Sequence, residues 1–432
     1  MRRRKGSALE VKHYRDIACF SSFRLSSNSE PMLRILKVVQ FYYPFLEKGG
    51  PVVKVRALAR KLAKRGHSVT VLTADWGLSS RNGHGLTPER CDWGWRTEED
   101  GVETVYLSSL ARYRALTVNS RVIRFCRSSL KGFDVVHFYG LYDLLGPAVS
   151  YYCRRESLPY VIEPMGMYRP IDRGFRRKSL WHRSVGNAFC GGSKLFIATA
   201  ELERQTLSEE GIPNDKIVVR YNGVDSDLAD AAKAVRGQFR EKWAIPAGEP
   251  LILFLSRLIP RKGADILIDA FLRACPTDGR LVIAGPDGEP GYRASLETRA
   301  KNSAADDRVI FTGPLYDNDK AAALADSDLF VLPSRYENFA NVAAEAMVCG
   351  VPVVVSDACG ISSLVDGKAG LVIPPQTEAI AAALQMLLGD KALCARFQQG
   401  CREVANQLSW DYLAAQMETH YAQALTSRKE PG

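Results

Sequence analysis

Short apolar runs rich in β-branched and aromatic residues alternate with segments of helical periodicity along most of this chain of 432 residues. This alternation is typical of parallel α/β structure, in which crossover helices join neighbouring strands. After a break near residues 221–225 the pattern restarts, so the sequence predicts two Rossmann-like, doubly wound domains facing a cleft. The expected strands are residues 34–41, 68–74, 103–107, 134–138, 159–163, 195–199, 250–256, 280–285, 308–312, 328–332 and 352–355.

The composition of the first residues and the order of the expected elements divide the chain into four expected segments. Residues 1–31 are polar and serine-rich, start with Met1-Arg-Arg-Arg-Lys5, and lack the apolar stretch of a secretory signal. We expect them to be a disordered extension upstream of an alternative start at Met32. The remaining segments are a first domain at 32–222, a second domain at 223–405 and a terminal helical segment at 406–432.

The cysteines and the apolar runs indicate the compartment. The ten cysteines are scattered, without a CxxC pair, which is typical of reduced thiols in a cytoplasmic protein. No apolar run approaches the length of a membrane span. We therefore expect a cytoplasmic protein. The charge distribution described below further suggests that it binds peripherally at the inner face of the cell membrane.

Two glutamates follow the expected strand 328–332. Glu337 lies in the loop after this strand, and Glu345 comes eight positions later in a segment with helical periodicity. Two helical turns separate positions eight apart, so both side chains can face one cleft. Carboxylates accept hydrogen bonds from vicinal hydroxyls, so the pair can hold a sugar ring and a ribose at opposite ends of one ligand.

Basic residues and glycines follow two other strands. Arg257 leaves the strand 250–256, and Lys262 precedes Gly263 at the start of a helix, an arrangement suited to a diphosphate. Gly49 and Gly50 lie between the first strand and a helix expected at 56–65, where glycine lets backbone approach a phosphate. The spacing is not GxGxxG, so it gives no indication of NAD.

A histidine and two Asp-x-Asp sequences complete the candidate groups. His137 ends the strand at 134–138, where it can bond a sugar hydroxyl or serve as a structural histidine. Asp225-Ser-Asp227 lies in the interdomain break, and Asp326-Ser-Asp328 precedes a buried strand. We reject both as metal sites because of these positions, and we expect no metal or other cofactor.

The net charge of +10 is concentrated in one region. Residues 111–190 contain 14 Lys or Arg and 5 Asp or Glu. The segments 113–131 and 169–183 interleave these cations with aliphatic and aromatic residues. A solvated surface is one interpretation, and an anionic membrane surface is the other. No nucleic-acid recognition motif accompanies the charge.

Taken in order, these motifs resemble the retaining GT-B glycosyltransferases of the glycosyl transferases group 1 family. The resemblance rests on Ser256-Arg257 with Lys262-Gly263, on Glu337-Asn-Phe339, and on Glu345-Ala-Met347 followed by Gly350-Val-Pro-Val353. Pro44 with Gly49-Gly50 and residues 65–69 are similar to its acceptor-side half, and residues 221–225 to its hinge. The resemblance covers residues 33–425.

The resemblance implies roles for these residues. Arg257 and Lys262 would hold the donor diphosphate, approached from the first domain by Gly49 and Gly50. Glu345 would hold the ribose, and domain closure would bring His137 to the sugar. The residues implied to meet the transferred sugar are Glu337, Asn338, Phe339, Ala340 and Asn341. It also implies an acceptor-side domain at 32–222, a nucleotide-sugar-binding domain at 223–405 and a helix at 406–432 that crosses back to the acceptor side.

The sequence departs from the family pattern at two places. Asn338 and Ala340 replace the glycines of the usual Glu-Gly-Phe-Gly loop, and a side chain at residue 340 disfavours a positive φ that glycine tolerates. The pocket for the sugar is therefore expected to differ in shape. Tyr139 stands where a second histidine is frequent, which leaves no role for a second imidazole there.

The resemblance and the charge pattern together predict a function. We expect a metal-independent transfer of a sugar from a nucleotide-diphosphate-sugar to a hydroxyl acceptor, with retention and without a protein nucleophile. The basic segments favour a lipid-linked or surface-polysaccharide glycan as acceptor and an anionic membrane as a partner. The alternatives are a nucleotide-sugar 2-epimerase of the same fold and a catalytically silent protein that binds membrane surfaces.

Overall fold

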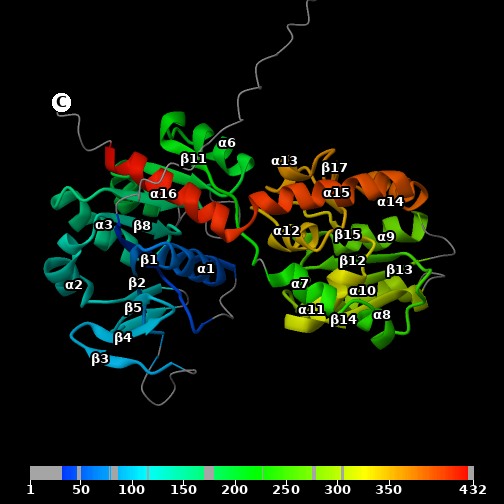
Figure 1. Ribbon diagram of the computed structural model, residues 1–432, viewed down its shortest axis with the longest axis horizontal. Helices are drawn as coiled ribbons and strands as arrows, with labels where there is room; N and C mark the ends of the chain where they lie inside the picture. Colours follow the sequence, from blue (N-terminus) through cyan, green and yellow to red (C-terminus); the bar gives the residue numbers. More distant parts are fainter. Residues whose placement is uncertain are drawn as a thin grey trace, which may run out of the picture. The chain divides into compact units, whose positions relative to one another are not determined.

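The computed structural model describes residues 32–45, 50–76, 78, 86–113, 116–169, 180–225, 227–274, 279–302 and 306–426. The predicted disordered extension at 1–31 lies outside the described residues. The described chain contains two large sheets, each built mainly from parallel strands (Figure 1). Every strand expected from the sequence is present within two residues of its expected bounds. The predicted fold class, two Rossmann-like doubly wound units, is confirmed.

The first sheet is formed by residues 34–219, and we call this part with its helices the N-lobe. Its nine strands have the order β11-β10-β9-β8-β1-β2-β5-β4-β3. The strands are β1 (Arg34–Val39), β2 (Ser68–Ala74), β3 (Glu89–Cys91), β4 (Gly94–Glu99), β5 (Val102–Leu107), β8 (Val135–Tyr139), β9 (Tyr160–Glu163), β10 (Leu195–Ala198) and β11 (Ile217–Val219). A separate hairpin joins β6 (Ala111–Tyr113) to β7 (Leu116–Val118).

The second sheet is formed by residues 251–373, and we call this part with its helices the C-lobe. Its six strands are all parallel, with the order β14-β13-β12-β15-β16-β17. Their apolar sequences are continuous rather than alternating, which is typical of strands covered on both faces. The strands are β12 (Leu251–Leu255), β13 (Arg280–Ala284), β14 (Val309–Gly313), β15 (Leu329–Leu332), β16 (Val353–Ser356) and β17 (Gly370–Ile373).

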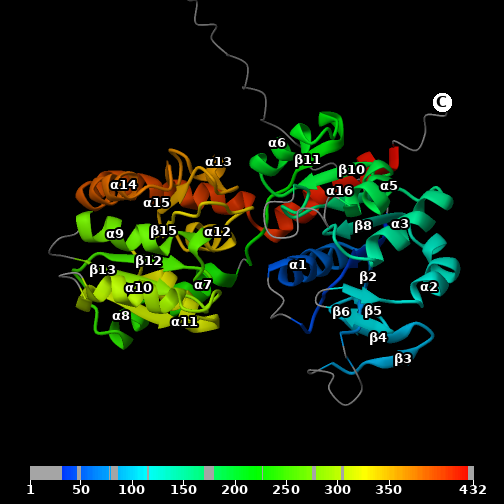
Figure 2. The same cartoon turned by 180° about the vertical axis from the view of Figure 1, so that it is seen from behind.

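Helices cover both sheets, and the views from front and back show α9 against α14, and α11 near α7 and α8, around the second sheet (Figure 2). The N-lobe helices are α1 (Gly50–Lys64), α2 (Val122–Ser129), α3 (Leu145–Arg155), α5 (Asn187–Gly191) and α6 (Glu201–Glu209). Those that follow are α7 (Asp227–Ala234), α8 (Gln238–Lys242), α9 (Ala264–Ala274), α10 (Tyr292–Lys301), α11 (Asp317–Asp326), α12 (Asn341–Val348), α13 (Ser362–Val365), α14 (Thr377–Gly389), α15 (Lys391–Gln407) and α16 (Trp410–Thr426). Short helical turns lie at Leu130–Gly132, His182–Gly186, Asn214–Lys216, Pro260–Lys262 and Asp306–Arg308.

Helix α1 shows how the sequence sets the bounds of an element. Its apolar residues recur at helical spacing and are buried, as in Val55, Leu58 and Leu62. The helix ends at Lys64, and Gly66 follows with φ +97, as expected for a glycine stop. Its start at Gly50 is six residues earlier than predicted, because Pro51 is well suited to the first turn of a helix.

The terminal helix α16 packs on the N-lobe although the chain has already passed through the C-lobe. Its buried residues Leu413, Met417 and Tyr421 join the core formed by α1 and the first sheet. The segment that leads back to the N-lobe, before α16, lies beside the segment that leads out of the N-lobe, after β11. The amide of Val224 in the outgoing segment donates to the carbonyl of Leu408 in the returning one at 2.8 Å. A side chain on Gly223 would lie 2.4 Å from the Trp410 ring, so glycine lets the two crossings approach.

Candidate functional site

The turn after β12 presents two basic residues at the end of the second sheet. Arg257 is exposed, whereas Lys262, at the end of a helical turn, is only 7% exposed. Gly263 follows with φ +75, and a Cβ there would lie 2.3 Å from the carbonyl oxygen of Pro333. Glycine therefore lets this turn pack against the chain that leaves β15. The sequence predicted the position of these cations correctly.

Lys262 contacts Glu337, which lies in the loop after β15. The Nζ atom of Lys262 pairs with Oε2 of Glu337, whose side chain is one-fifth exposed. Burial, together with the nearby positive charges of Arg261 and Arg257, lowers the pKa of Lys262 to about 8. Lys262, Arg261 and Arg257 therefore place three positive charges near one another in this turn, and an added anion would stabilise them.

The loop at 337–341 is held by the loop after β16. The amide of Glu337 donates to Ala358 at 3.0 Å, and the amide of Gly360 donates back to Glu337 at 2.9 Å. A side chain on Gly360 would lie 1.9 Å from the carbonyl oxygen of Asn338, so the two loops can lie this close only with glycine there. These contacts fix the backbone that carries Glu337.

Ala340 adopts the conformation that the sequence led us to doubt. Its φ is +82 and its ψ is 64, in the left-handed region, immediately before α12 begins at Asn341. A non-glycine residue in this region costs on the order of 1 kcal/mol. The backbone at Ala340 therefore has a conformation that glycine would also adopt, and it does not produce the expected change in pocket shape.

A small cavity of about 130 Å³ lies between this loop and the start of α1, and we call it the α1 cavity. Gly50 and Lys54 of α1 line one side, and residues 337–341 line another. Gly50 and Asn341 are the first residues of α1 and α12, so two helix N-termini meet at this cavity. Helix N-termini and a lysine favour an anion. Gly49, predicted to contribute here, lies outside the described residues.

Three contacts join the loop at 337–341 to segments on the N-lobe side. The side-chain amide of Asn338 donates to Oγ1 of Thr199 at 2.7 Å. Asn222 donates to Asn341 at 2.8 Å, and the rings of Tyr221 and Phe339 stack with centroids 6.0 Å apart. Sequence reasoning named the residues of the loop but missed Thr199, which carries no motif.

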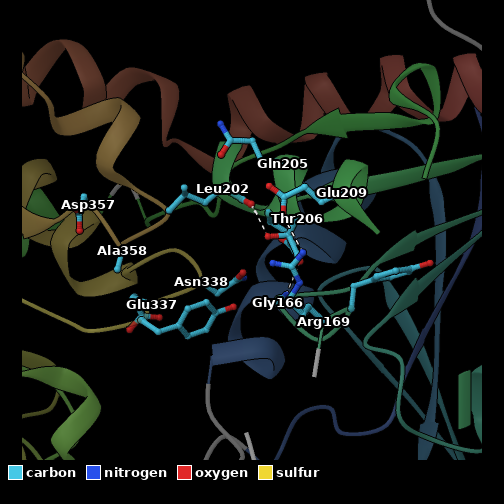
Figure 3. A pocket seen from close by; sticks show the side chains of 13 residues that line it. Gly166, Arg169, Leu202, Gln205, Thr206, Glu209, Glu337, Asn338, Asp357 and Ala358 are labelled. Carbon is cyan, nitrogen blue, oxygen red and sulfur yellow. Dashed lines mark hydrogen bonds and ion pairs between the residues drawn. The ribbon is translucent and has the colours of Figure 1, made fainter. Parts of the chain in front are cut away.

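A second cavity, of about 290 Å³, lies on the other side of Asn338 (Figure 3), and we call it the α6 cavity. Gln205, Thr206 and Glu209 of α6 line it from the N-lobe. Glu337 and Asn338 line both cavities, so the predicted loop forms the partition between them. Arg169 donates to Glu209 at 2.8 Å.

The structure does not bring His137 to either cavity. Its side chain is fully buried, with Nδ1 2.9 Å from the Tyr421 hydroxyl of α16 and Nε2 3.5 Å from Glu163. Burial lowers the pKa of His137 to about 3. The expectation that domain closure would bring His137 to the sugar is therefore corrected, because this imidazole is enclosed within the N-lobe core.

Glu345 also lies away from the two cavities. It is in the second half of α12, where Oε1 accepts a hydrogen bond from Lys320 of α11 at 3.0 Å. Neither the α1 cavity nor the α6 cavity includes Glu345. Of the two glutamates that we expected to face one cleft, only Glu337 lines these cavities. A ribose contact by Glu345 stays a prediction.

The second Asp-x-Asp sequence stabilises backbone. Asp326 accepts hydrogen bonds from the amides of Gly237, Phe239 and Arg240, at 2.5 to 3.0 Å. Asp328 accepts from Leu251 at 2.8 Å. These carboxylates therefore have structural partners within the C-lobe.

Comparisons with known proteins identify the family. The model of the glycosyl transferases group 1 family matches residues 235–404, and that of Glycosyltransferase Family 4 matches residues 48–228. A D-inositol 3-phosphate glycosyltransferase of Xylanimonas cellulosilytica is 29% identical over 395 residues, covering 88% of this chain and 93% of the relative. The chain belongs to the group 1 glycosyltransferases. Another protein of this name, from Jonesia denitrificans, is 36% identical over 186 residues, covering 41% of this glycosyltransferase and 43% of the relative.

Solved structures show the same fold. A glycosyltransferase of Rickettsia africae superposes on this glycosyltransferase with a TM-score of 0.72 at 19% identity, covering 92% of this chain and 99% of the other. Anabaena Alr3699/HepE in complex with UDP and glucose gives 0.67 at 21% identity, covering 91% and 100%. Within the ranges that the structure describes, no helix has the length and apolar character needed to cross a membrane.

Proposed function

We propose that this glycosyltransferase moves a sugar from a nucleotide-diphosphate-sugar to a hydroxyl acceptor, with retention at the anomeric carbon and without a metal. The observation that carries the proposal is the contact of Lys262 with Glu337, the carboxylate that lines the α1 cavity, where two helix N-termini meet. A cation cluster beside helix N-termini suits a diphosphate, and a carboxylate suits sugar hydroxyls. The Anabaena neighbour, solved with UDP and glucose, supports the same class of donor.

Each site residue has a role in this proposal. Arg257 and Lys262 hold the diphosphate and stabilise the negative charge that it gains on leaving. Glu337 and the backbone at 338–341 hold the transferred sugar. No protein nucleophile is required, because an oxygen of the leaving phosphate accepts the proton of the acceptor hydroxyl on the same face of the sugar. The ribose contact by Glu345 rests on the family resemblance.

A panel of UDP-, GDP- and ADP-sugars tests this function. We expect one donor to raise the thermal unfolding midpoint and to be consumed with an added acceptor, and NMR should show that the product keeps the anomeric configuration of the donor. An inverted product would contradict the proposed mechanism. A free 2-epimer formed without acceptor would indicate the epimerase, and no binding by any nucleotide sugar would favour a silent protein.

The acceptor is proposed to be a lipid-linked or surface-polysaccharide glycan reached at an anionic membrane. The β6–β7 hairpin exposes Tyr113, Leu116 and Val118, and the register Tyr113–Leu116 and Ala111–Val118 places these side chains on one face. Helix α2 begins four residues after β7. It exposes the apolar Ile123 and, one turn later, the basic Arg127. The second basic segment, at 169–183, falls largely outside the described residues.

Vesicle flotation tests the membrane contact. We expect the parent chain to float with vesicles containing anionic phosphatidylglycerol at low salt, and high salt to release it. The variant Tyr113→Ser/Leu116→Ser/Val118→Ser should lose about 10-fold or more in binding, because the exposed apolar side chains no longer enter the interface. Tyr316→Ser, an exposed aromatic of the C-lobe, is the matched control and should bind normally. A parent chain that stays in solution at low salt would refute the membrane contact.

A further inference from the structure

The α6 cavity adjoins the proposed sugar site through Glu337 and Asn338, the residues common to both cavities. The partition is anchored, since Asn338 donates to Thr199 and the Thr199 hydroxyl donates to Glu203 of α6 at 2.7 Å. A molecule in the α6 cavity therefore lies next to the sugar held by Glu337. If the donor occupies the α1 cavity as proposed, the α6 cavity is the place for the acceptor.

Acidic groups predominate around the α6 cavity among the described residues. Its lining contains one cation, Arg169, and four carboxylates, those of Glu203, Glu209, Glu337 and Asp357. Two of these carboxylates have partners outside this set: Glu337 pairs with Lys262, and Glu203 accepts from the amide and hydroxyl of Thr199. The described lining therefore offers a phosphate or carboxylate a single cation, Arg169.

The one cation is already bound by acidic partners. The guanidinium of Arg169 donates to Glu209 at 2.8 Å and to Glu210 at 2.7 Å. A phosphate could use this guanidinium only by competing with two carboxylates for it. The remaining N–H groups of Arg169 can still donate to neutral oxygens, because a guanidinium has five donors.

The same lining suits a neutral ring with many hydroxyls. Carboxylates accept from hydroxyls, and Gln205 and Thr206 add an amide and a hydroxyl oxygen. Tyr168 and Tyr336 contribute aromatic surface, which pairs with the apolar face of a ring. Figure 3 shows Arg169 and Glu209 on the N-lobe side and Glu337 on the C-lobe side of this space.

We propose that the α6 cavity binds the acceptor as an uncharged, hydroxyl-rich ring and disfavours a ring that carries a phosphate monoester. This inference rests on the proposed donor site. The proposed acceptor differs from the one in the name of the relatives called D-inositol 3-phosphate glycosyltransferases, because that name specifies a phosphorylated ring. In a lipid-linked glycan, the terminal sugar would enter the cavity while the phosphates of the lipid carrier remain outside it.

Matched acceptors test the inference. We expect kcat/KM for methyl α-glucoside, methyl α-mannoside or myo-inositol to exceed that for the corresponding phosphate monoester by at least about 10-fold, which corresponds to about 1.4 kcal/mol. The variant Glu209→Gln/Glu210→Gln removes two negative charges and releases Arg169, so it should reduce this preference by about 10-fold. Glu201→Gln changes the same charge on α6 outside the cavity lining and should leave the preference unaltered.

Donor binding, measured by calorimetry in the same samples, separates the outcomes. A chain that binds donor but uses the phosphate monoesters as well as the neutral rings, or uses none of the neutral rings, would overturn the acceptor inference alone. An unchanged preference in Glu209→Gln/Glu210→Gln would also contradict the role of the acidic charge. A chain that binds no nucleotide sugar would overturn the proposed function and, with it, this inference.

Discussion

Replacing Lys262 by alanine is expected to slow sugar transfer by about 100- to 1000-fold, the usual effect of removing one preorganised group that stabilises developing charge. Lys262 is desolvated at the end of the helical turn after β12 and contacts Glu337, so its ammonium is already in place when the diphosphate leaves. The loss should fall mainly on kcat, because the charge on the leaving group is greatest in the transition state. Initial rates with saturating donor measure it.

The pH dependence provides an independent readout of the same residue. Since burial lowers the pKa of Lys262 to about 8, the free enzyme loses this positive charge as the pH rises through 8. We expect kcat/KM for the donor to fall above that pH in the parent chain. Lys262→Arg keeps its charge at every accessible pH, so its residual activity should lack this decline. Transfer by Lys262→Ala within a few-fold of the parent chain, with unchanged thermal unfolding, would refute the site assignment.

The features that sequence reasoning predicted are those encoded locally. Arg257, Lys262 and Glu337 follow apolar strands of one parallel sheet, and the ends of such strands meet at one edge. Their proximity could therefore be inferred without coordinates. The strands β3 and β4 were missed, because the residues at 89–99 are mostly polar and have no continuous apolar run.

The features that escaped prediction depend on contacts between distant segments. The bond from Asn338 to Thr199 joins residues 139 positions apart, and the α6 cavity is completed by both lobes. The burial of His137 follows from the return of α16, whose Tyr421 covers it. Strand periodicity alone does not distinguish a histidine that faces a ligand from one covered by a helix 284 positions later.

Glu163 also went unnoticed in the sequence, although an acidic residue directly after the apolar run Tyr160–Ile162 was a usable signal. Its side chain is fully buried at the end of β9. It pairs with Lys54 of α1, and Arg220 donates to it at 2.6 Å. Burial alone would raise the pKa of Glu163, but Arg220 and Lys54 hold it well below 4.5.

We expect Glu163→Gln to lower the free energy of unfolding by about 3 to 5 kcal/mol, because it leaves Arg220 and Lys54 buried without their common counter-charge. Denaturant unfolding followed by circular dichroism measures the change. Glu156→Gln is the matched control, since it breaks the more exposed pair with Lys131 and should cost less than about 1 kcal/mol. Glu163→Gln/Arg220→Met removes one of the stranded cations and should unfold less readily than Glu163→Gln.

At acid pH, the parent chain and Glu163→Gln should have the same free energy of unfolding. The folded-state pKa of Glu163 lies below its ordinary value of 4.5, so the stabilisation is complete above that value and is lost as the pH falls toward the folded-state pKa. The two free energies of unfolding should therefore differ fully at pH 7 and converge only in acid. A constant difference across this range would show that the carboxylate acts through packing rather than through its charge. Because Lys54 lines the α1 cavity, the same ion pairs connect the stability of the N-lobe to the wall of the proposed donor site.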